Sequence, residues 1–405
     1  MLRRQLLAKT TTSRFFNANL THQYAPDLLQ RWRRPKIGTS YGLLNLGVCL
    51  RRHIHIPNFL LPPVIFTGLV IALYIWKSFI MVSLQNKIIY APYLPPTARF
   101  EKISDWQRKL FGIEWKELHM RSIDGTDLAL AVASVSSEPD HVEVNHDGVS
   151  HHVYILYLQG NASSLPPRLP DHSWILRNIR DEFKNRYPEC GKVRFTQVGL
   201  SYRGYWTSAG RPNEIGINQD TIAATQWIFQ LHDNTYHGRD EDGQHKVKPI
   251  FIIWGQSIGS GFATNLAASG VIPAQLEPAA LLLETPFLSI KEMLETIYPE
   301  KWLPYRYLHP FIRNHLDSYK NLGIIAEQRK EKGLRLPRIF ILEAGRDEVV
   351  PPRHADELRK RCNELHLPVE TEVVPKAFHS DAMIGRVHVA EFIMRQTARV
   401  IGTDY

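Results

Sequence analysis

Cysteine is scarce in this sequence, and the few that occur are not paired. The 405 residues include only Cys49, Cys190 and Cys362, and no Cys-x-x-Cys pair occurs. An odd number of widely separated cysteines argues against a disulfide framework or a zinc cluster. The sequence also lacks His-Glu-x-x-His, a P-loop, and a Gly-x-Gly-x-x-Gly that opens a helix after a strand. We therefore expect neither a metal nor a nucleotide cofactor.

Acidic residues are almost missing from the first 58 positions. This segment holds ten of the 49 lysines and arginines but a single acid, Asp27, so the rest of the chain is neutral although the net charge is +9. A neutral main domain does not offer the basic groove that nucleic acid requires, and we expect no nucleic-acid partner. The opening MLRRQLLAKTTTSRFF has the composition of a mitochondrial transit peptide, and a basic cytosolic tail is the alternative.

One long apolar run follows this basic segment. Within residues 59–84, the chain from Val64 onward is apolar for about 20 positions and contains one charge, Lys77. An apolar run of this length is sufficient to cross a bilayer. We predict a single transmembrane anchor at 59–84 after a targeting or cytosolic/matrix tail at 1–58. A buried helix of the main domain is the alternative. Because the basic residues lie before the run, the tail is expected in the cytosol or matrix, with a mitochondrial membrane favoured over the endoplasmic reticulum.

After a linker at 85–114, the chain alternates between strand-like and helix-like segments. Asp124-Gly125 joins two strands in a predicted hairpin, and six later apolar runs are typical of strands buried on both faces. These runs cover residues 153–160, 193–202, 250–257, 279–287, 338–345 and 369–378. Amphipathic helices are expected between them at 174–187, 217–231, 259–268, 352–365 and 387–400. Strands separated by helices predict an α/β domain at 115–400 with a mostly parallel sheet flanked by helices.

The span from Ser289 to Leu336 interrupts this alternation. It contains Trp302 and several tyrosines and prolines, followed by a run of charged residues. We interpret residues 288–336 as a small helical cap inserted after the sixth strand. The sequence shows no internal repeat.

The segment Gly255-Gln256-Ser257-Ile258-Gly259 follows a predicted buried strand and precedes a helix that begins with small residues. This is the G-x-S-x-G nucleophile elbow of the α/β-hydrolase fold, in the strand–turn–helix context that the motif requires. Bulky neighbours would collide on such a tight turn, which explains the glycines. The helix N-terminus directs backbone N–H groups toward developing negative charge. We therefore predict Ser257 as the nucleophile of a serine hydrolase that forms an acyl-enzyme.

Two further residues complete a predicted catalytic triad in the chain order that this fold uses. Asp347 follows the strand at 338–345 and His379 follows the strand at 369–378. We expect His379 to act as general base toward Ser257 and Asp347 to orient its imidazole. The open alternatives are a helix-cap role for Asp347 and other residues near strand ends, namely Glu284 as the acid and His151, His152 or His354 as the base.

An oxyanion hole needs two N–H donors beside the nucleophile. One is expected from Ile258, directly after the serine, and the other from the turn after the strand at 153–160. In that turn Gly160 permits close approach of the backbone, and we place the second donor at Asn161. An ordinary glycine turn is the alternative.

Several stretches together resemble the membrane-tethered α/β-hydrolase-domain-containing proteins of eukaryotes, especially their bud-emergence-suppressor branch. The resemblance covers roughly residues 60–400. It is carried by QNKIIY at 85–90, PYLPP at 92–96, GNA at 160–162, YRGY at 202–205, SAGRPNE at 208–214, Asp220 with Ala223, Ala224 and Trp227, GQSIGSG at 255–261 and GRD at 345–347. The resemblance implies an N-terminal single-pass anchor, the triad given above, and a substrate that is an acyl ester or thioester, either a lipid or an acylated protein.

The sequence departs from the pattern of this family at three places. The family usually has His where Gln159 stands, Gly where Trp206 stands, and His-Asn-Asp where this chain has His379-Ser380-Asp381. The substrate pocket implied by the resemblance, with Trp206 near its entrance, is lined by Gln159, Ala162, Tyr205, Trp206 and Gln256. Because of Gln159 and Trp206, a catalytically weak membrane scaffold is an alternative function. A serine peptidase that uses the same triad is another.

Overall fold

The computed structural model describes residues 57–138, 149–236 and 247–402, so the predicted tail at 1–58 lies almost wholly outside the described residues. The strands are β1 (Lys116–Arg121), β2 (Asp127–Ser136), β3 (Val149–Leu158), β4 (Lys192–Leu200), β5 (Lys248–Gln256), β6 (Pro278–Glu284), β7 (Arg338–Ala344) and β8 (Val369–Val374). The α-helices are α1 (Leu61–Ser83), α2 (Gln85–Tyr90), α3 (Leu169–Arg186), α4 (Glu214–Thr235), α5 (Ile258–Ala268), α6 (Ile290–Ile297), α7 (Ser318–Glu331), α8 (Arg353–Glu364) and α9 (Arg386–Gly402).

The strands form one sheet in the order β1-β2-β4-β3-β5-β6-β7-β8. The predicted hairpin pairs β1 with β2, and β2 also runs antiparallel to β4, whereas every other neighbouring pair is parallel. The carboxyl ends of β3, β5, β6, β7 and β8 therefore meet at one edge of the sheet, where ligand sites of open α/β sheets collect. The prediction of a mostly parallel sheet flanked by helices is confirmed.

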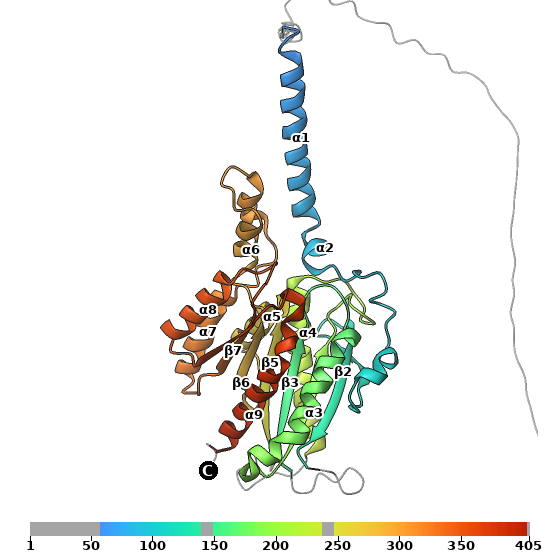
Figure 1. Cartoon of the computed structure of the whole chain (residues 1–405), viewed down its shortest axis with the longest axis vertical. Helices are drawn as coiled ribbons and strands as arrows, with labels where there is room; N and C mark the ends of the chain where they lie inside the picture. The colour runs from blue at the N-terminus through green and yellow to red at the C-terminus, as the bar shows by residue number, and fades with distance from the viewer. Residues whose placement is uncertain (1–56, 139–148, 237–246, 403–405) are drawn as a thin grey trace, which may run out of the picture. The chain divides into compact units, whose positions relative to one another are not determined.

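Alternating side chains of the central strands enter two different layers of the core. In β3, Ile155 and Tyr157 belong to the cluster that includes α3 and α9, whereas Leu156 and Leu158 belong to the cluster that includes α4, α5, α7 and α8. Figure 1 shows α3 and α9 lying together across one face of the sheet. Burial on both faces explains why these strands are continuous apolar runs. Each such buried Leu or Ile contributes about 1.5–3 kcal/mol to folding.

The range predicted as a cap contains two different kinds of structure. Within 288–336, α6 has no buried residue, and two short 3₁₀ helices follow it at Pro304–Tyr307 and His309–Phe311. By contrast, α7 buries Leu322 and Ile325 in the cluster formed with α5 and α8. Helix α7 thus belongs to the layer that covers the sheet, whereas α6 touches that layer only through the partly buried Ile290 and Met293.

Helix α1 occupies most of the range that was predicted to cross a membrane. It is 23 residues long, contains a single charged residue, Lys77, and buries none of its side chains. Leu69 and Leu73, for example, are 59% and 65% exposed. A helix of this length spans about 35 Å, which is enough to cross the hydrocarbon core of a bilayer. Among the described residues it is the one helix that is long and apolar enough to do so.

Candidate active site

Ser257 lies in the turn between β5 and α5 with a φ of 50° and a ψ of −116°. This conformation is strained for a residue that carries a side chain. The flanking glycines allow the turn, because a Cβ on Gly255 would lie 2.2 Å from the Gly259 oxygen and a Cβ on Gly259 would lie 2.0 Å from the Leu158 oxygen. The Ser257 N–H donates a hydrogen bond to the backbone oxygen of Glu284 at 2.8 Å, which fixes the turn against β6.

The structure brings Ser257, His379 and Asp347 together at the carboxyl edge of the sheet. His379 Nε2 lies 3.0 Å from Ser257 Oγ, and His379 Nδ1 lies 2.8 Å from Asp347 Oδ2. Asp347 stands in the turn after β7, and His379 begins the 3₁₀ helix His379–Gly385 that follows β8. The three side chains form one hydrogen-bonded chain with the distances that proton transfer from the hydroxyl requires.

The two oxygens of Asp347 contact different partners. Oδ2 contacts His379, whereas Oδ1 accepts hydrogen bonds from the N–H groups of Val349 at 2.9 Å and Val350 at 2.7 Å. Burial raises the pKa of Asp347, but the hydrogen bonds from His379, Val350 and Val349 outweigh it, so the pKa lies below its usual value. The carboxylate is therefore ionised and holds the imidazole with Nε2 toward the serine.

The predicted oxyanion-hole donors are backbone N–H groups that have no acceptor within the part of the chain that the structure describes. One belongs to Ile258, which begins α5, and the other to Asn161, in the turn after β3. In that turn, the Gly160 N–H donates to Gln256 Oε1 at 3.4 Å. Ile258 and Asn161 are the two residues that the sequence predicted as oxyanion-hole donors, and that role stays a prediction.

The turn that contains Asn161 is fastened by the linker after α1. The Ala162 N–H donates to the Tyr90 oxygen at 3.0 Å, and the Ser163 N–H donates to the Leu94 oxygen at 2.5 Å. Ala162 and Ser163 both have positive φ, at 55° and 62°, so these bonds hold a conformation that the turn would not readily adopt alone. The linker therefore helps to set the position of the Asn161 N–H.

Gln159 is fully buried, yet its side-chain amide has no hydrogen-bond partner among the described residues. Its backbone oxygen accepts a hydrogen bond from Tyr202 Oη at 2.9 Å. An unpaired buried amide costs about 1–3 kcal/mol, and such groups in native structures are often found at functional sites. Gln159 thus lies in the interior beside the turn that carries Asn161, with polar atoms that a ligand or water can satisfy.

Tyr205 and Trp206, which the resemblance placed in the substrate pocket, are fully buried. The Tyr205 hydroxyl donates to the Tyr90 oxygen, and Trp206 Nε1 donates to the Glu101 oxygen at 2.7 Å. Trp206 also joins the apolar cluster on the α3 face of the sheet. Both side chains pack against the linker, which differs from the entrance position expected for Trp206.

Gln256, in the elbow, is the centre of a hydrogen-bonded network that sequence reasoning did not identify. Its Oε1 accepts from Tyr157 Oη at 3.1 Å and from the Arg168 guanidinium, and its Nε2 donates to Glu284 Oε1 at 2.7 Å. Arg168 ends the 3₁₀ helix Pro166–Arg168, shortly after the turn that carries Asn161. Nothing in the local pattern around Arg168 marks it as a partner of the elbow.

Glu284, the rival acid, is fully buried behind the elbow and makes no hydrogen bond to His379. Its carboxyl group accepts from Trp254 Nε1 at 3.1 Å and from Gln256 Nε2 at 2.7 Å. Burial raises the pKa of Glu284 to about 7, although these hydrogen bonds and the charge of Arg168 act in the opposite direction. The acid that contacts the imidazole is Asp347.

The rival histidines have other partners. His354 is buried; its Nδ1 accepts from the Leu288 N–H at 3.2 Å, and its Nε2 lies 3.0 Å from Thr296 Oγ1. Burial lowers the pKa of His354 to about 4. His151 and His152 lie in the first half of β3, at the opposite end of the strand from the turn that carries Asn161.

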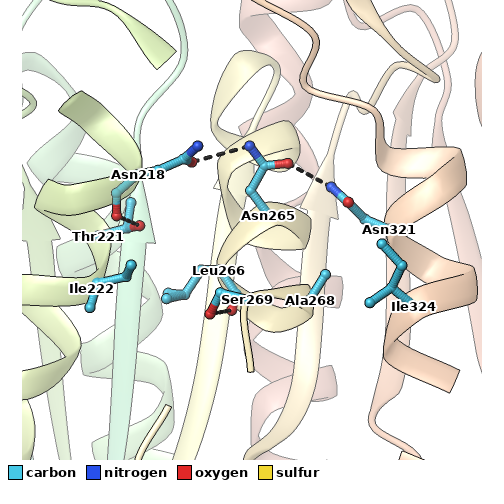
Figure 2. A pocket seen from close by; sticks show the side chains of 9 residues that line it. All are labelled: Asn218, Thr221, Ile222, Asn265, Leu266, Ala268, Ser269, Asn321 and Ile324. Carbon is cyan, nitrogen blue, oxygen red and sulfur yellow. Dashed lines mark hydrogen bonds between the residues drawn. The ribbon is translucent and has the colours of Figure 1, made fainter. Parts of the chain in front are cut away.

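A pocket of about 260 Å³ lies between α4, α5 and α7 (Figure 2). Asn265 Nδ2 donates to Asn218 Oδ1 at 3.1 Å, and Asn265 Oδ1 accepts from Asn321 Nδ2 at 2.6 Å, so the three amides link the three helices. None of the predicted site residues lines this pocket. Within the described ranges, no group of three His, Cys, Asp or Glu side chains is arranged to hold a metal ion.

Comparison with known sequences gives relatives but no matching family model. Lysophosphatidylserine lipase ABHD12 of Macaca fascicularis is 33% identical over 239 residues, which are 57% of this chain and 51% of that protein. An uncharacterized protein of Mycobacterium tuberculosis is 33% identical over 198 residues, 47% of this chain and 57% of that protein. The chain thus spans about half the length of the curated relatives it matches.

Comparison with solved structures shows the fold. The α/β hydrolase from Vibrio vulnificus superposes with a TM-score of 0.51 and 18% identity, over 77% of this chain and 92% of that one. With the strand order and the elbow, this likeness shows that the chain has the α/β-hydrolase fold, and its homology to ABHD12 agrees. The assignment to the bud-emergence-suppressor branch is not tested by these matches and stays a prediction.

Proposed function

We propose that the chain is a membrane-anchored serine hydrolase that cleaves acyl esters or thioesters of lipids or of acylated proteins. The observation that carries the proposal is the hydrogen-bonded chain from Asp347 through His379 to Ser257. His379 Nε2 can accept the proton of the Ser257 hydroxyl, while Nδ1 is hydrogen-bonded to the Asp347 carboxylate, whose pKa is lowered.

Acylation begins when Ser257 Oγ attacks the carbonyl carbon of the substrate while His379 Nε2 takes the hydroxyl proton. The carbonyl oxygen becomes an oxyanion that accepts hydrogen bonds from the N–H groups of Ile258 and Asn161. The tetrahedral intermediate then collapses, the bond to the leaving oxygen or sulfur breaks, and His379 returns its proton to that atom. Water attacks the acyl-enzyme in the same way, with His379 again as base, and releases the fatty acid and Ser257.

The substrate class follows from the anchor and the relatives rather than from a mapped pocket. Helix α1 would hold the elbow close to a bilayer, where acyl chains are concentrated. The name of the ABHD12 relatives supports a lipid ester as substrate, and the same chemistry accepts a thioester. Gln159, Ala162 and Gln256, which lie at the turn and the elbow, are the pocket residues that we retain.

For location, we propose a single-pass arrangement with residues 1–58 in the cytosol or matrix. A mitochondrial membrane is favoured over the endoplasmic reticulum because of the composition of the first residues.

The direct test is labelling of the purified full chain with a fluorophosphonate probe, which reacts with activated serines. The wild type is expected to be labelled, and Ser257→Ala is expected to abolish labelling. Asp347→Asn should lower turnover of an acyl ester by about 10³–10⁴-fold with little change in folding, because it leaves the imidazole in the wrong tautomer. Ser380→Ala is the matched control, since Ser380 is exposed and its hydroxyl donates to Asp381 Oδ1 and to no other described residue.

Absence of labelling in a folded wild-type chain would favour the membrane scaffold as the function. Labelling combined with faster turnover of peptide amides than of acyl esters would favour the peptidase instead.

A further inference from the structure

Large apolar side chains are exposed on the segment that connects β6 to α7. Within Ile290–Phe311, here called the cap segment, Ile297 is 60% exposed, Trp302 71%, Tyr307 53% and Phe311 60%. Single exposed apolar residues are ordinary on proteins, but several large ones on one short segment indicate a surface that contacts something apolar. Helix α6, the first element of the cap segment, has no fully buried residue, and only Ile290 and Met293 pack against the core.

The cap segment contacts α1 through aromatic rings. The rings of Tyr305 and Tyr74 are 5.4 Å apart, and Lys77 Nζ lies 4.4 Å from the centre of the Tyr305 ring and 5.2 Å from that of Tyr298. The Tyr298 hydroxyl lies 3.7 Å from Met81 Sδ. The last three turns of α1 are therefore in contact with the cap segment.

These contacts fix the depth of the cap segment if α1 crosses a bilayer. Tyr74 lies nine residues before the end of α1 at Ser83, which is about 13 Å along the helix axis. Half of the hydrocarbon core is about 15 Å thick. A side chain that contacts Tyr74 and Lys77 must then lie within the same leaflet rather than in water.

Charged groups support the same depth. Lys77 is the one charged residue of α1, and a lysine inside a membrane helix costs about 2.5–3.5 kcal/mol. Two tyrosine rings around its ammonium group reduce this cost through cation–π attraction. Closer to the end of the helix, the Arg313 guanidinium donates to the Val82 oxygen at 3.0 Å, a position that corresponds to the polar surface of the bilayer.

We propose that the cap segment is a second membrane contact, whose exposed aromatic and aliphatic side chains insert among the acyl chains of the leaflet that α1 enters. The proposal rests on the function proposed above, because it requires α1 to be the anchor. The cap segment begins shortly after Glu284, whose backbone oxygen accepts a hydrogen bond from the Ser257 N–H. Just beyond its other end, Asn314 Oδ1 accepts a hydrogen bond from the Tyr90 hydroxyl at 2.7 Å. An inserted cap segment therefore brings the elbow to the lipid surface, where an acyl chain can reach it.

The test measures depth with a fluorophore attached at single cysteines of the full chain in phosphatidylcholine vesicles. Cys49→Ser removes a competing thiol, and Cys190 and Cys362 are buried. The reporters are Trp302→Cys and, as a second position, Phe311→Cys. Trp76→Cys reports on α1, and Leu334→Cys, in the loop after α7, serves as the control in water. Each labelled chain is first shown to react with a fluorophosphonate, so that only folded protein is compared.

We expect the labels at 302 and 311 to be quenched by lipids that carry nitroxides on their acyl chains, and to be several-fold less accessible to iodide than the label at 334. Iodide quenching at 302 and 311 as strong as at 334, with the label at 76 protected, would overturn the proposal and leave the anchor intact. Iodide quenching at 76 as well would overturn both the anchor and this proposal. Loss of fluorophosphonate reaction in the unlabelled wild type would instead be a failure of the proposed catalysis.

Discussion

Glu284 places a carboxyl group with a raised pKa directly behind the nucleophile. Its pKa of about 7 exceeds the ordinary value of 4.5, so the folded protein retains a proton that the unfolded chain loses between pH 4.5 and 7. The free energy of unfolding is therefore highest below pH 4.5, as far as Glu284 is concerned. It falls by roughly 3 kcal/mol in total as the pH rises to 7. Above pH 7 the carboxylate is ionised and this contribution no longer changes.

We expect Glu284→Gln to remove this part of the pH dependence. The thermal midpoint of the wild type in detergent should fall more steeply between pH 5 and 8 than that of Glu284→Gln. The comparison of slopes isolates the residue, because all other titrating groups are shared by the two chains. Parallel slopes would show that Glu284 titrates normally in the folded protein.

At the scale of residues, the sequence identified the three side chains that the structure brings into one hydrogen-bonded chain, because each stands at a recognisable junction of strand and turn. Ser257 has glycines around it, and Asp347 and His379 follow apolar runs. The contact of Arg168 with Gln256 joins residues 88 positions apart and leaves no local pattern. The burial of Trp206 was also not predictable, because it depends on the path of the linker that covers it.

At the scale of elements, the elbow depends on the close approach of α5 to β3. A Cβ on Gly259 would lie 2.0 Å from the Leu158 oxygen and 2.8 Å from the Gln159 oxygen, and backbone atoms cannot move away as a flexible side chain can. We therefore expect Gly259→Ala to destabilise the protein by an amount at the upper end of about 1–3 kcal/mol and to abolish fluorophosphonate labelling.

Gly402→Ala is the matched control for this substitution, since a Cβ on Gly402 meets no atom of the described residues within 4 Å. Thermal unfolding of the three chains in detergent measures the difference. An unchanged midpoint and full labelling for Gly259→Ala would show that the turn has more room than the structure indicates.

The positions of strands and helices were largely predictable, because apolar runs and helical periodicity are local properties. Helix α7 was harder, since its charged residues at 327–332 suggested a solvated cap. Whether a helix of this composition covers the sheet depends on a few buried positions, Leu322 and Ile325, and on the surface that α5 and α8 offer them. Such surfaces arise only when the chain has folded.

At the scale of the whole molecule, membrane attachment should depend on the exposed apolar side chains of α1. Each lysine placed in the middle of a membrane helix costs about 2.5–3.5 kcal/mol, so Leu69→Lys combined with Leu73→Lys should release much of the chain from membranes. Carbonate extraction followed by sedimentation measures the released fraction. Leu334→Lys, outside α1, should leave the chain in the pellet, and retention of the double variant as well would contradict a spanning role for α1.

The length and composition of the apolar run were sufficient to predict a helix at this place. The contact of Tyr298 and Tyr305 with Lys77 was not predictable, because more than 200 positions separate the two tyrosines from the lysine. Contacts of this kind are set by the way in which the cap segment leaves the sheet.

The bonds from Tyr90 and Leu94 to the turn at 160–163 have a consequence for proteolytic release. A protease that cut before β1 would remove the acceptors of the Ala162 and Ser163 N–H groups, together with Tyr90, Leu110 and Trp115, which are buried in the two core clusters. The turn at 160–163 would lose two of its backbone hydrogen bonds, and with them a constraint on the position of Asn161. Since the released domain would lose part of its core packing as well as the constraint on this turn, we expect proteolytic detachment to lower any hydrolase activity rather than to free a fully active domain.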